Sequence, residues 1–328
     1  MLQIGLQITN NYKKYLKLLD LLNENYNFNN KVDFIHIPKQ NEIIKYIENL
    51  DVLHCYQIDK TYFDKATTKL KWIQIGAAGV EKSLIKEVIK SKTIITNVSG
   101  IHAEPVSEYV LSTILYFNKL FNDIILFKKN KQWTQWDIAS RIDQLKNKTI
   151  GIIGYGKIGI EISKKAKAFK MKVIATKRLQ KRTETKRFVD KLIPISDLSI
   201  LLKESDFVVI CCPLTPLTKN MITLDQLKLM KKTSILINIA RGDIINEQDL
   251  IHALKTQCIG GAALDVFTNE PLSNKSELFK LENAFISPHI SGNYKNYQKD
   301  MIQFFGENLN RFIMGKTLKN RICKKRLY

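Results

Sequence analysis

The chain of 328 residues is 45% hydrophobic and 25% charged, which is the composition of a globular protein long enough for about two domains. Its net charge of +21 comes from lysines spread along the whole chain, so a biased background composition explains the charge better than a nucleic-acid-binding stripe does. No apolar run reaches about 18 residues and no signal peptide is evident, so we expect neither a membrane-spanning nor a secreted protein. Five cysteines without a CxxC or a metal-ligand spacing predict free thiols in the cytoplasm and no metal site.

Residues 1–98 alternate between apolar, strand-like segments and amphipathic helical segments such as Tyr12 to Leu22. The strand candidates are QIGLQI (3–8), VDFIHI (32–37), DVLHCY (51–56), KWIQIG (71–76) and TIITNV (93–98). This alternation predicts a small α/β domain, to which a helical pattern from Lys299 to Phe312 could return. We therefore assign residues 1–98 and 296–328 to one domain.

A long helical pattern from Pro105 to Phe127 leads into a second region, residues 99–295, where continuous apolar strands alternate with amphipathic helices. The helices are expected from Lys157 to Phe169 and from Glu247 to Lys255, the latter capped by Asn246. The strand candidates are TIGII (149–153), KVIAT (172–176), FVVICC (207–212), SILINI (234–239), IGGAALDV (259–266) and AFISP (284–288). Strands that are apolar on both faces indicate a parallel sheet covered by helices on both sides.

The first strand of this second region runs into a glycine-rich loop with the spacing GxGxxG. The loop consists of Gly154, Tyr155, Gly156, Lys157, Ile158 and Gly159. It follows a predicted strand and opens a predicted helix, which is the context of a dinucleotide fingerprint. The glycines allow a tight turn, a close approach of the pyrophosphate and close packing of helix on strand, and the helix N-terminus offers N–H groups to the phosphates. The loop therefore predicts an NAD(P) site.

The end of the second strand bears on which dinucleotide is bound. NAD sites usually place an Asp or Glu about 20 residues after the glycine loop, where it accepts hydrogen bonds from the adenosine ribose. Here no acidic residue occurs between Glu161 and Glu184, and the strand ends with Thr176, Lys177 and Arg178. Cations at this position would pair with the 2′-phosphate of NADP. We therefore favour NADP(H) over NAD(H), on the missing acid more than on the bases.

Three further segments follow strands at the edge where doubly wound sheets bind ligands: NIARGD (238–243), DVFTNEP (265–271) and SPHISG (287–292). Together with the glycine loop, the tract CCPLTPLT (211–218) and the loop GAAGVE (76–81), they resemble in order the D-isomer-specific 2-hydroxyacid dehydrogenases. This family includes glyoxylate/hydroxypyruvate reductases, D-lactate dehydrogenases and phosphoglycerate dehydrogenases. The resemblance implies an α/β fold of two doubly wound domains: a Rossmann dinucleotide-binding domain (99–295) and a smaller flavodoxin-like substrate domain (1–98 plus 296–328).

The chemistry of the family assigns a role to three of these residues. Reduction of a 2-oxo acid requires a cation for its carboxylate and carbonyl oxygen, and Arg241 offers a planar, two-pronged donor. Histidine suits proton transfer in both directions, a role for His289. Glu270 would hydrogen-bond the imidazole and fix its orientation. In the family an Arg and a His–Glu pair form the catalytic set, so the resemblance implies that Arg241, Glu270 and His289 are catalytic.

The resemblance also implies further binding residues. The expected substrate-binding residues are Ala78, Gly79 and Val80, whose loop binds the acid through backbone N–H groups, together with Arg241 and His289. The expected cofactor-binding residues are the six of the glycine loop and Ser107, Thr176, Lys177, Arg178, Cys212, Pro213, Thr218, Ala240, Arg241, Asp265, His289 and Gly292. Among these, Asp265 would face the nicotinamide carboxamide.

The long helix of the family and the segment after it build a two-fold dimer, so residues 102–140 are expected to form a homodimer interface. Trp133 and Trp136 fall in this segment. We interpret them as ordinary core or interface tryptophans in preference to residues that reach a partner's active site.

The sequence thus predicts an oxidoreductase that transfers a hydride between NAD(P)H and a small 2-oxo acid, with glyoxylate or hydroxypyruvate as the best candidates. One alternative is an NAD-linked phosphoglycerate-type dehydrogenase, for which Lys82 and Lys86 are candidate phosphate contacts. The other is a dinucleotide-sensing, corepressor-like interaction protein, because such proteins can keep the Arg, Glu and His. Turnover of glyoxylate by the purified protein would distinguish the enzyme from the sensor, and a nucleic-acid partner is not expected.

Overall fold

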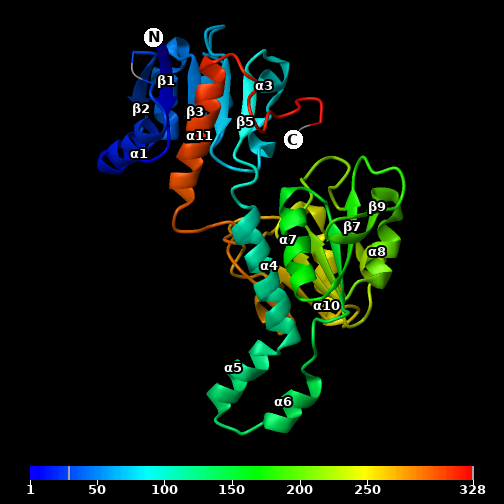
Figure 1. The fold of residues 1–328 in the computed structure, drawn as a ribbon. Coiled ribbons are helices and arrows are strands. Elements are labelled where there is room, and N and C mark those ends of the chain that lie inside the picture. Colours follow the sequence, from blue (N-terminus) through cyan, green and yellow to red (C-terminus); the bar gives the residue numbers. More distant parts are fainter. Residues whose placement is uncertain (29, 327–328) are drawn as a thin grey trace. The chain divides into compact units, whose positions relative to one another are not determined.

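The computed structural model describes residues 1–28 and 30–326. The chain divides into two compact units (Figure 1): unit 1 comprises Met1–Ile101 and Tyr294–Tyr328, and unit 2 comprises His102–Asn293. Each unit has its own sheet and its own hydrophobic clusters. The predicted α/β class with two doubly wound sheets is therefore confirmed.

Unit 1 is built, within its described residues, on a parallel sheet of five strands in the order β2-β1-β3-β4-β5. The strands are β1 (Leu2–Leu6), β2 (Val32–His36), β3 (Val52–Cys55), β4 (Trp72–Ile75) and β5 (Ile94–Asn97). They coincide with the five apolar segments of the sequence to within two residues at each end. The strand order reverses between β1 and β3, so the carboxyl ends of these strands border a topological switch point.

Helices cover both faces of the sheet of unit 1. They are α1 (Tyr12–Asn25), α2 (Lys60–Phe63), α3 (Lys86–Lys90) and α11 (Tyr297–Ile313), with short 3₁₀ helices at Gln40–Lys45, Ile47–Asn49 and Glu81–Ser83. Trp72 joins the cluster beneath α1 and α11, whereas its neighbour Ile73 joins the cluster that contains residues of α2 and α3. Successive residues of β4 thus enter opposite faces, as the two-residue period of a strand requires.

Unit 2 contains, in the part of the chain that the structure describes, an eight-stranded sheet in the order β13-β12-β11-β10-β6-β7-β9-β8. The strands are β6 (Thr149–Ile153), β7 (Lys172–Lys177), β8 (Glu184–Lys186), β9 (Val189–Pro194), β10 (Phe207–Ile210), β11 (Ile235–Asn238), β12 (Gly261–Leu264) and β13 (Ala284–Ile286). Neighbouring strands are parallel except β8 and β9, which form an antiparallel pair at one edge. The sequence did not predict this pair because β8 is only three residues long and contains no apolar residue, and β9 has no regular alternation of polar and apolar residues.

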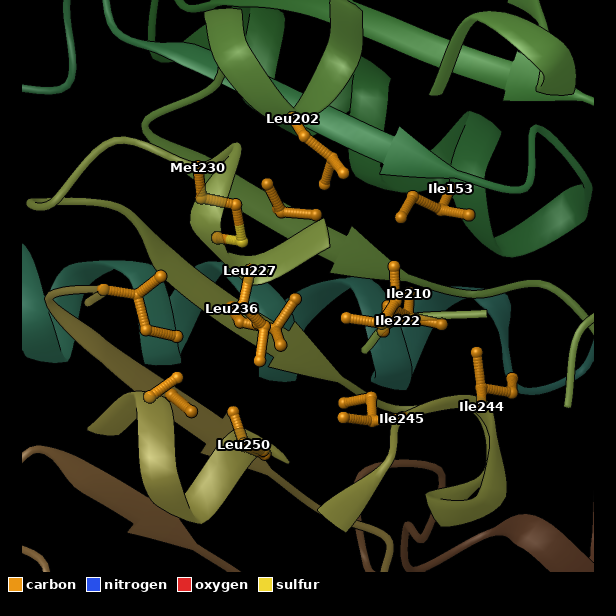
Figure 2. Close-up of a cluster of buried hydrophobic side chains, with 14 of the residues drawn as sticks. Ile153, Leu202, Ile210, Ile222, Leu227, Met230, Leu236, Ile244, Ile245 and Leu250 are labelled. Carbon is orange, nitrogen blue, oxygen red and sulfur yellow. The ribbon is translucent and has the colours of Figure 1, made fainter. Parts of the chain in front are cut away.

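Helices also cover both faces of the sheet of unit 2. The helices that pack on it are α4 (Ala103–Asn118), α7 (Lys157–Ala168), α8 (Leu198–Glu204), α9 (Leu224–Lys228) and α10 (Glu247–Lys255), with 3₁₀ helices at Ile195–Asp197, Gly242–Ile244 and Glu277–Lys280. Two further helices, α5 (Phe121–Asn130) and α6 (Gln135–Arg141), follow α4 in the chain. One cluster lies under α4 and α7. In the other, shown in Figure 2, Leu202 of α8, Leu227 of α9 and Leu250 of α10 converge on Ile210 and Leu236 of the sheet.

The continuous helix predicted from Pro105 to Phe127 is wrong. Helix α4 ends at Asn118, α5 begins at Phe121, and the two are bent by 58°. Leu120 between them has φ 53°, a left-handed conformation that ends one helix and redirects the chain. Neither α5 nor α6 contributes a buried residue, and Figure 1 shows both extending beyond the end of α4.

No single helix in residues 1–28 and 30–326 is long and apolar enough to cross a membrane. Helices α4 and α5 pass such a test only as a bent pair, by length and composition. Much of α4 is buried in the core of unit 2.

Candidate active site

The glycine loop joins β6 to α7 and has the geometry of a phosphate-binding turn. Gly154 has φ 109°, and a Cβ there would lie 2.8 Å from the backbone nitrogen of Cys212. A Cβ on Gly159 would lie 2.5 Å from the carbonyl oxygen of Gly154, whereas a Cβ on Gly156 would meet nothing within 4 Å. No side chain caps the first turn of α7, so the positive end of the helix is open to an anion. The residues present therefore fit a dinucleotide pyrophosphate.

The end of β7 is attached directly to this glycine loop. The carbonyl oxygen of Thr176 accepts a hydrogen bond from the N–H of Tyr155 at 2.8 Å. The Oγ1 of Thr176 accepts a second bond from the N–H of Gly154 at 3.3 Å. Lys177 and Arg178, the next two residues, are exposed. The two cations thus follow immediately after a residue that contacts the phosphate-binding turn.

The next carboxylate in the sequence, Glu184, does not replace the missing acid at the end of β7. It lies on β8, and β9 separates β8 from β7 in the sheet. Its Oε1 pairs with Nζ of Lys186 at 2.8 Å, and this hydrogen bond lowers the pKa of Glu184. The carboxylate is therefore engaged on its own strand.

His289 and Glu270 form a hydrogen-bonded pair in unit 2. His289 Nδ1 lies 2.7 Å from Glu270 Oε2, and Glu270 Oε1 accepts from the N–H of Phe267 at 3.0 Å. Partial burial acts to raise the pKa of Glu270, but the hydrogen bonds from His289 and Phe267 and the charge of Arg241 outweigh it and leave that pKa lowered. Because an ionised carboxylate can only accept, Nδ1 donates and Nε2 is left to exchange a proton with another group. His289 is half exposed and has φ 54°, a left-handed conformation that is rare for a non-glycine residue.

Arg241 is held at the end of β11 by its own loop. Its Nη1 donates to the carbonyl oxygen of Ala240 at 2.6 Å, and its carbonyl oxygen accepts from Asn238 Nδ2 at 2.9 Å. A Cβ on Gly242 would lie 1.9 Å from the carbonyl carbon of Phe267, so a glycine is required where this loop contacts the Glu270 loop. The charge of Arg241 lowers the pKa of Glu270, as stated above. It also adds to burial in lowering the pKa of His102. The Arg and the His–Glu pair of the sequence analysis are thus brought into one electrostatic neighbourhood.

Asp265 organises the loop that carries His289. It is fully buried, and its Oδ1 accepts from Ser287 Oγ at 2.5 Å and from the N–H of Ile290 at 2.8 Å. Its Oδ2 accepts from the N–H of Ser291 at 2.8 Å. Tyr109 of α4 extends the network through its hydroxyl, 2.5 Å from Ser287 Oγ. Of these three residues, only Asp265 was predicted from the sequence as a binding residue. Ser287 lies inside the SPHISG motif and could have been predicted, whereas Tyr109 is distant in sequence.

The residues expected after β10 form one wall of the glycine loop. Cys211 donates from Sγ to the carbonyl oxygen of Gly154 at 3.0 Å, and the backbone of Cys212 lies against Gly154. Thr218 folds the following loop by donating from Oγ1 to the carbonyl oxygen of Pro213 at 2.7 Å. Burial raises the pKa of the Cys212 thiol to about 12, so this side chain is uncharged at neutral pH.

Two of the remaining expected cofactor residues lie near the start of α4. Ser107 is fully buried, and its hydroxyl donates to the carbonyl oxygen of Glu104 at 2.7 Å. Gly292 lies against His102, because a Cβ on the glycine would come within 2.9 Å of His102 Cδ2. The structure thus places Gly292 beside His102, whose pKa is lowered by burial and by the charge of Arg241.

A pocket of about 670 Å³ opens beside the His–Glu pair. Its lining is mainly apolar and comprises Phe267, Pro271, Leu272, Phe279, Ile286 and Pro288, together with Ser287, Glu270 and His289. Within the described residues no group of three or more His, Cys, Asp or Glu side chains could hold a metal ion, and all five cysteines are free.

The loop of residues 76–80 follows β4 in unit 1. The Nδ2 of Asn97 donates to the carbonyl oxygen of Ala78 at 2.6 Å, and the hydroxyl of Tyr297 donates to that of Gly76. The backbone N–H groups of residues 77–79 have no partner among the described residues. Neither side chain was predicted from the sequence to have a role. Asn97 is a polar residue next to the end of the predicted strand 93–98 and could have been considered, but Tyr297 reaches the loop only through the packing of α11.

Comparison with known proteins gives a consistent family. Residues 111–291 match the family model described as D-isomer specific 2-hydroxyacid dehydrogenase, NAD binding domain. A glyoxylate reductase of Pyrococcus horikoshii is 35% identical over 286 residues, which cover 85% of this chain and 84% of the relative.

Solved structures agree over nearly the whole chain. A D-isomer-specific 2-hydroxyacid dehydrogenase family protein from Aeromonas salmonicida has a TM-score of 0.84 at 29% identity and covers 98% of this chain and 99% of its own. An NADPH-dependent glyoxylate/hydroxypyruvate reductase from Sinorhizobium meliloti, solved with NADP and sulfate, has a TM-score of 0.84 at 21% identity with full coverage of both chains, which shows the shared fold. The chain therefore belongs to the D-isomer-specific 2-hydroxyacid dehydrogenases, a family of NAD(P)-dependent oxidoreductases.

Proposed function

We propose that the protein is an NADPH-dependent reductase of small 2-oxo acids in which Arg241, Glu270 and His289 are catalytic. The observation that carries this proposal is the His289 Nδ1 to Glu270 Oε2 hydrogen bond of 2.7 Å in the neighbourhood of Arg241. His289, Glu270 and Arg241 all lie in unit 2, which also contains the glycine loop. A hydrogen-bonded acid–base pair, a guanidinium and a dinucleotide site together supply what the reduction of a 2-oxo acid needs.

His289 is the proton donor in this reaction. A reduced nicotinamide bound to this unit would supply a hydride to the carbonyl carbon of the substrate, whose carbonyl oxygen then requires a proton. Glu270 holds Nδ1 and keeps the imidazole oriented, so Nε2 can deliver a proton to that oxygen, and in oxidation it takes the proton back.

The substrate carboxylate is bound in this proposal by a cation and by backbone amides. Arg241 can present two parallel N–H donors to a carboxylate and a carbonyl oxygen. In unit 1, Ala78, Gly79 and Val80 belong to the loop whose N–H groups at residues 77–79 have no partner within the described part of the chain. Successive free amides of this kind form concave anion sites. Both features favour an acid over a neutral carbonyl compound.

Two observations favour NADPH over NADH. Lys177 and Arg178 follow Thr176, whose backbone and hydroxyl contact the glycine loop, and Glu184 is engaged two strands away. A cationic strand end suits a 2′-phosphate, whereas a ribose 2′-hydroxyl is usually met by a carboxylate. Glyoxylate or hydroxypyruvate is the proposed substrate because the similar proteins from Pyrococcus horikoshii and Sinorhizobium meliloti carry those names.

We also propose a homodimer formed through residues 102–140. Helices α5 and α6 bury none of their residues. These helices and the segment between them carry large exposed apolar side chains: Ile124, Ile125, Leu126, Trp133 and Trp136. Trp133 and Trp136 are 80% and 78% exposed, so the structure supports an interface role for them and not the role of core residues. An exposed apolar segment of this kind is typical of a protein–protein contact, and light scattering of the purified protein measures the mass of the assembly directly.

Five free thiols support a reducing compartment such as the cytoplasm.

Replacement of the proton donor tests the proposed function. In His289→Ala, kcat for glyoxylate with NADPH should fall by about 10²- to 10⁴-fold, the range that general acid catalysis contributes. His252→Ala is the matched control, because His252 is exposed on α10 and should leave kcat unchanged. Equal activity of His289→Ala and the wild type, or no turnover of any small 2-oxo acid by the wild type, would contradict the proposal.

A further inference from the structure

We propose that Tyr297, together with Asn97, is a positioning residue that fixes the peptide planes of the loop at residues 76–79, so that its amides meet the substrate carboxylate. This inference deepens the proposed function and rests on it. Tyr297 is the first residue of α11, more than 200 positions away from the loop in sequence. It enters the site of unit 1 only because α11 packs beside β4.

The planarity of the peptide bond links the direction of each carbonyl in the loop to the direction of the next N–H. A trans peptide is planar, and its C=O and the N–H of the next residue point in opposite directions. A hydrogen bond that holds one carbonyl therefore also fixes the direction of the following N–H. The free N–H groups of residues 77–79 belong to the same planes as the carbonyls of residues 76–78.

Each of these three carbonyls is held from within unit 1. The hydroxyl of Tyr297 donates to the carbonyl oxygen of Gly76. The N–H of Val98 donates to that of Ala77 at 3.3 Å, and Nδ2 of Asn97 donates to that of Ala78 at 2.6 Å. In each of these three planes the carbonyl points toward a donor within unit 1, so the N–H of the next residue points away from that donor. Such a row of amides is the arrangement that captures a carboxylate.

The Tyr297 contact is well suited to this role. The His54 ring also lies against Gly76, because a Cβ on the glycine would come within 2.9 Å of His54 Cε1. Gly76 thus packs against an imidazole ring, and its carbonyl oxygen accepts from the Tyr297 hydroxyl. Burial, followed by the nearby Tyr56, raises the pKa of Tyr297, so its hydroxyl remains a donor throughout the neutral range. Asn97 is itself fixed, since its Oδ1 accepts from the N–H of Ser99 at 3.1 Å.

Removal of one oxygen atom tests this inference. In Tyr297→Phe, KM for glyoxylate should rise about five- to tenfold, as expected for loss of one hydrogen bond that orients the loop. The kcat and the KM for NADPH should stay within about twofold of the wild type, because the proton donor and the cofactor loop lie in unit 2. Tyr294→Phe is the matched control: this hydroxyl donates to Asp300 Oδ2 at 2.6 Å and not to the loop, so its KM should not change.

Oxalate binding separates this inference from the proposed function. Calorimetry of the wild type and Tyr297→Phe with NADPH present measures the affinity for a carboxylate without any turnover, and oxalate should bind about five- to tenfold more weakly to the variant. An active wild type with unchanged KM and unchanged oxalate affinity in Tyr297→Phe would overturn the positioning role while leaving the reductase intact. A wild type that turns over no 2-oxo acid would overturn the proposed function, but oxalate binding would still test the loop. In that case, equal oxalate affinities of the wild type and Tyr297→Phe, or no oxalate binding to either, would overturn the inference as well.

Discussion

His54 is a fully buried histidine of β3, and neither of its ring nitrogens has a hydrogen-bond partner in the described residues. Burial lowers its pKa from 6.5 to about 4, so the folded protein holds the imidazole neutral. The unfolded chain therefore binds more protons than the folded chain between these two values. The stabilisation is fully present above pH 6.5 and is lost as the pH falls toward 4.

This pKa difference predicts a pH-dependent stability of unit 1. The free energy of unfolding should fall by up to about 3 kcal/mol between pH 7 and pH 4 on account of His54 alone, since each pKa unit corresponds to ~1.4 kcal/mol. Urea denaturation of the wild type and His54→Leu at both pH values measures the difference, because other groups titrate equally in the two proteins. Parallel pH slopes for the two proteins would refute the assignment.

The proposed catalytic residues could be proposed from the sequence because each lies in a short motif next to a strand. The structure brings Arg241, Glu270 and His289 into one electrostatic neighbourhood in unit 2. Tyr109 and Tyr297 could not be found, because each acts through a contact with a segment far away in sequence. Long-range packing, which a single sequence does not reveal, decides such contacts.

The loop after β7 is the element that bears on cofactor choice. In Lys177→Asp with Arg178→Ala, kcat/KM for NADPH should fall about 10- to 100-fold, because charge-assisted hydrogen bonds to the 2′-phosphate are lost. The value for NADH should fall much less, since NADH lacks that phosphate. Steady-state kinetics with both cofactors measures the ratio.

A matched variant in the same loop controls for net charge. Lys181→Asp with Arg182→Ala makes the same change in charge at two exposed residues further from the glycine loop. Its kcat/KM for NADPH should remain within about threefold of the wild type. An equal loss in the two double variants would point to long-range charge and not to a 2′-phosphate contact, and a wild type that prefers NADH would contradict the proposed cofactor.

Elements were predictable where periodicity and packing agree. The buried strands β6 and β10 are continuous apolar runs, and the Asn246 cap of α10 is confirmed by bonds to the N–H groups of Gln248 and Asp249 at 3.2 Å. The break between α4 and α5 was missed because apolar spacing continues through it, whereas Leu120 takes a left-handed conformation. A backbone turn at a leucine leaves no signal in a hydrophobic pattern.

At the scale of the whole molecule, alternating strands and helices predicted the α/β class, but strand order comes from pairing across the sheet. The reversals at β1/β3 and β6/β10 bring loops from distant motifs to the same sheet edge within each unit. In unit 2 this edge receives the glycine loop, the Cys212 loop and the Arg241 loop. The function thus follows from topology that joins motifs which are individually weak.

Reduction of a 2-oxo acid by hydride transfer, with D stereochemistry, can be followed with a labelled cofactor. The purified protein is incubated with hydroxypyruvate and reduced nicotinamide dinucleotide deuterated at C4 on the transferred position, and the product is resolved on a chiral column with mass detection. We expect D-glycerate that carries one deuterium at C2. L-glycerate, a racemic product, or glycerate without deuterium at C2 would contradict this expectation.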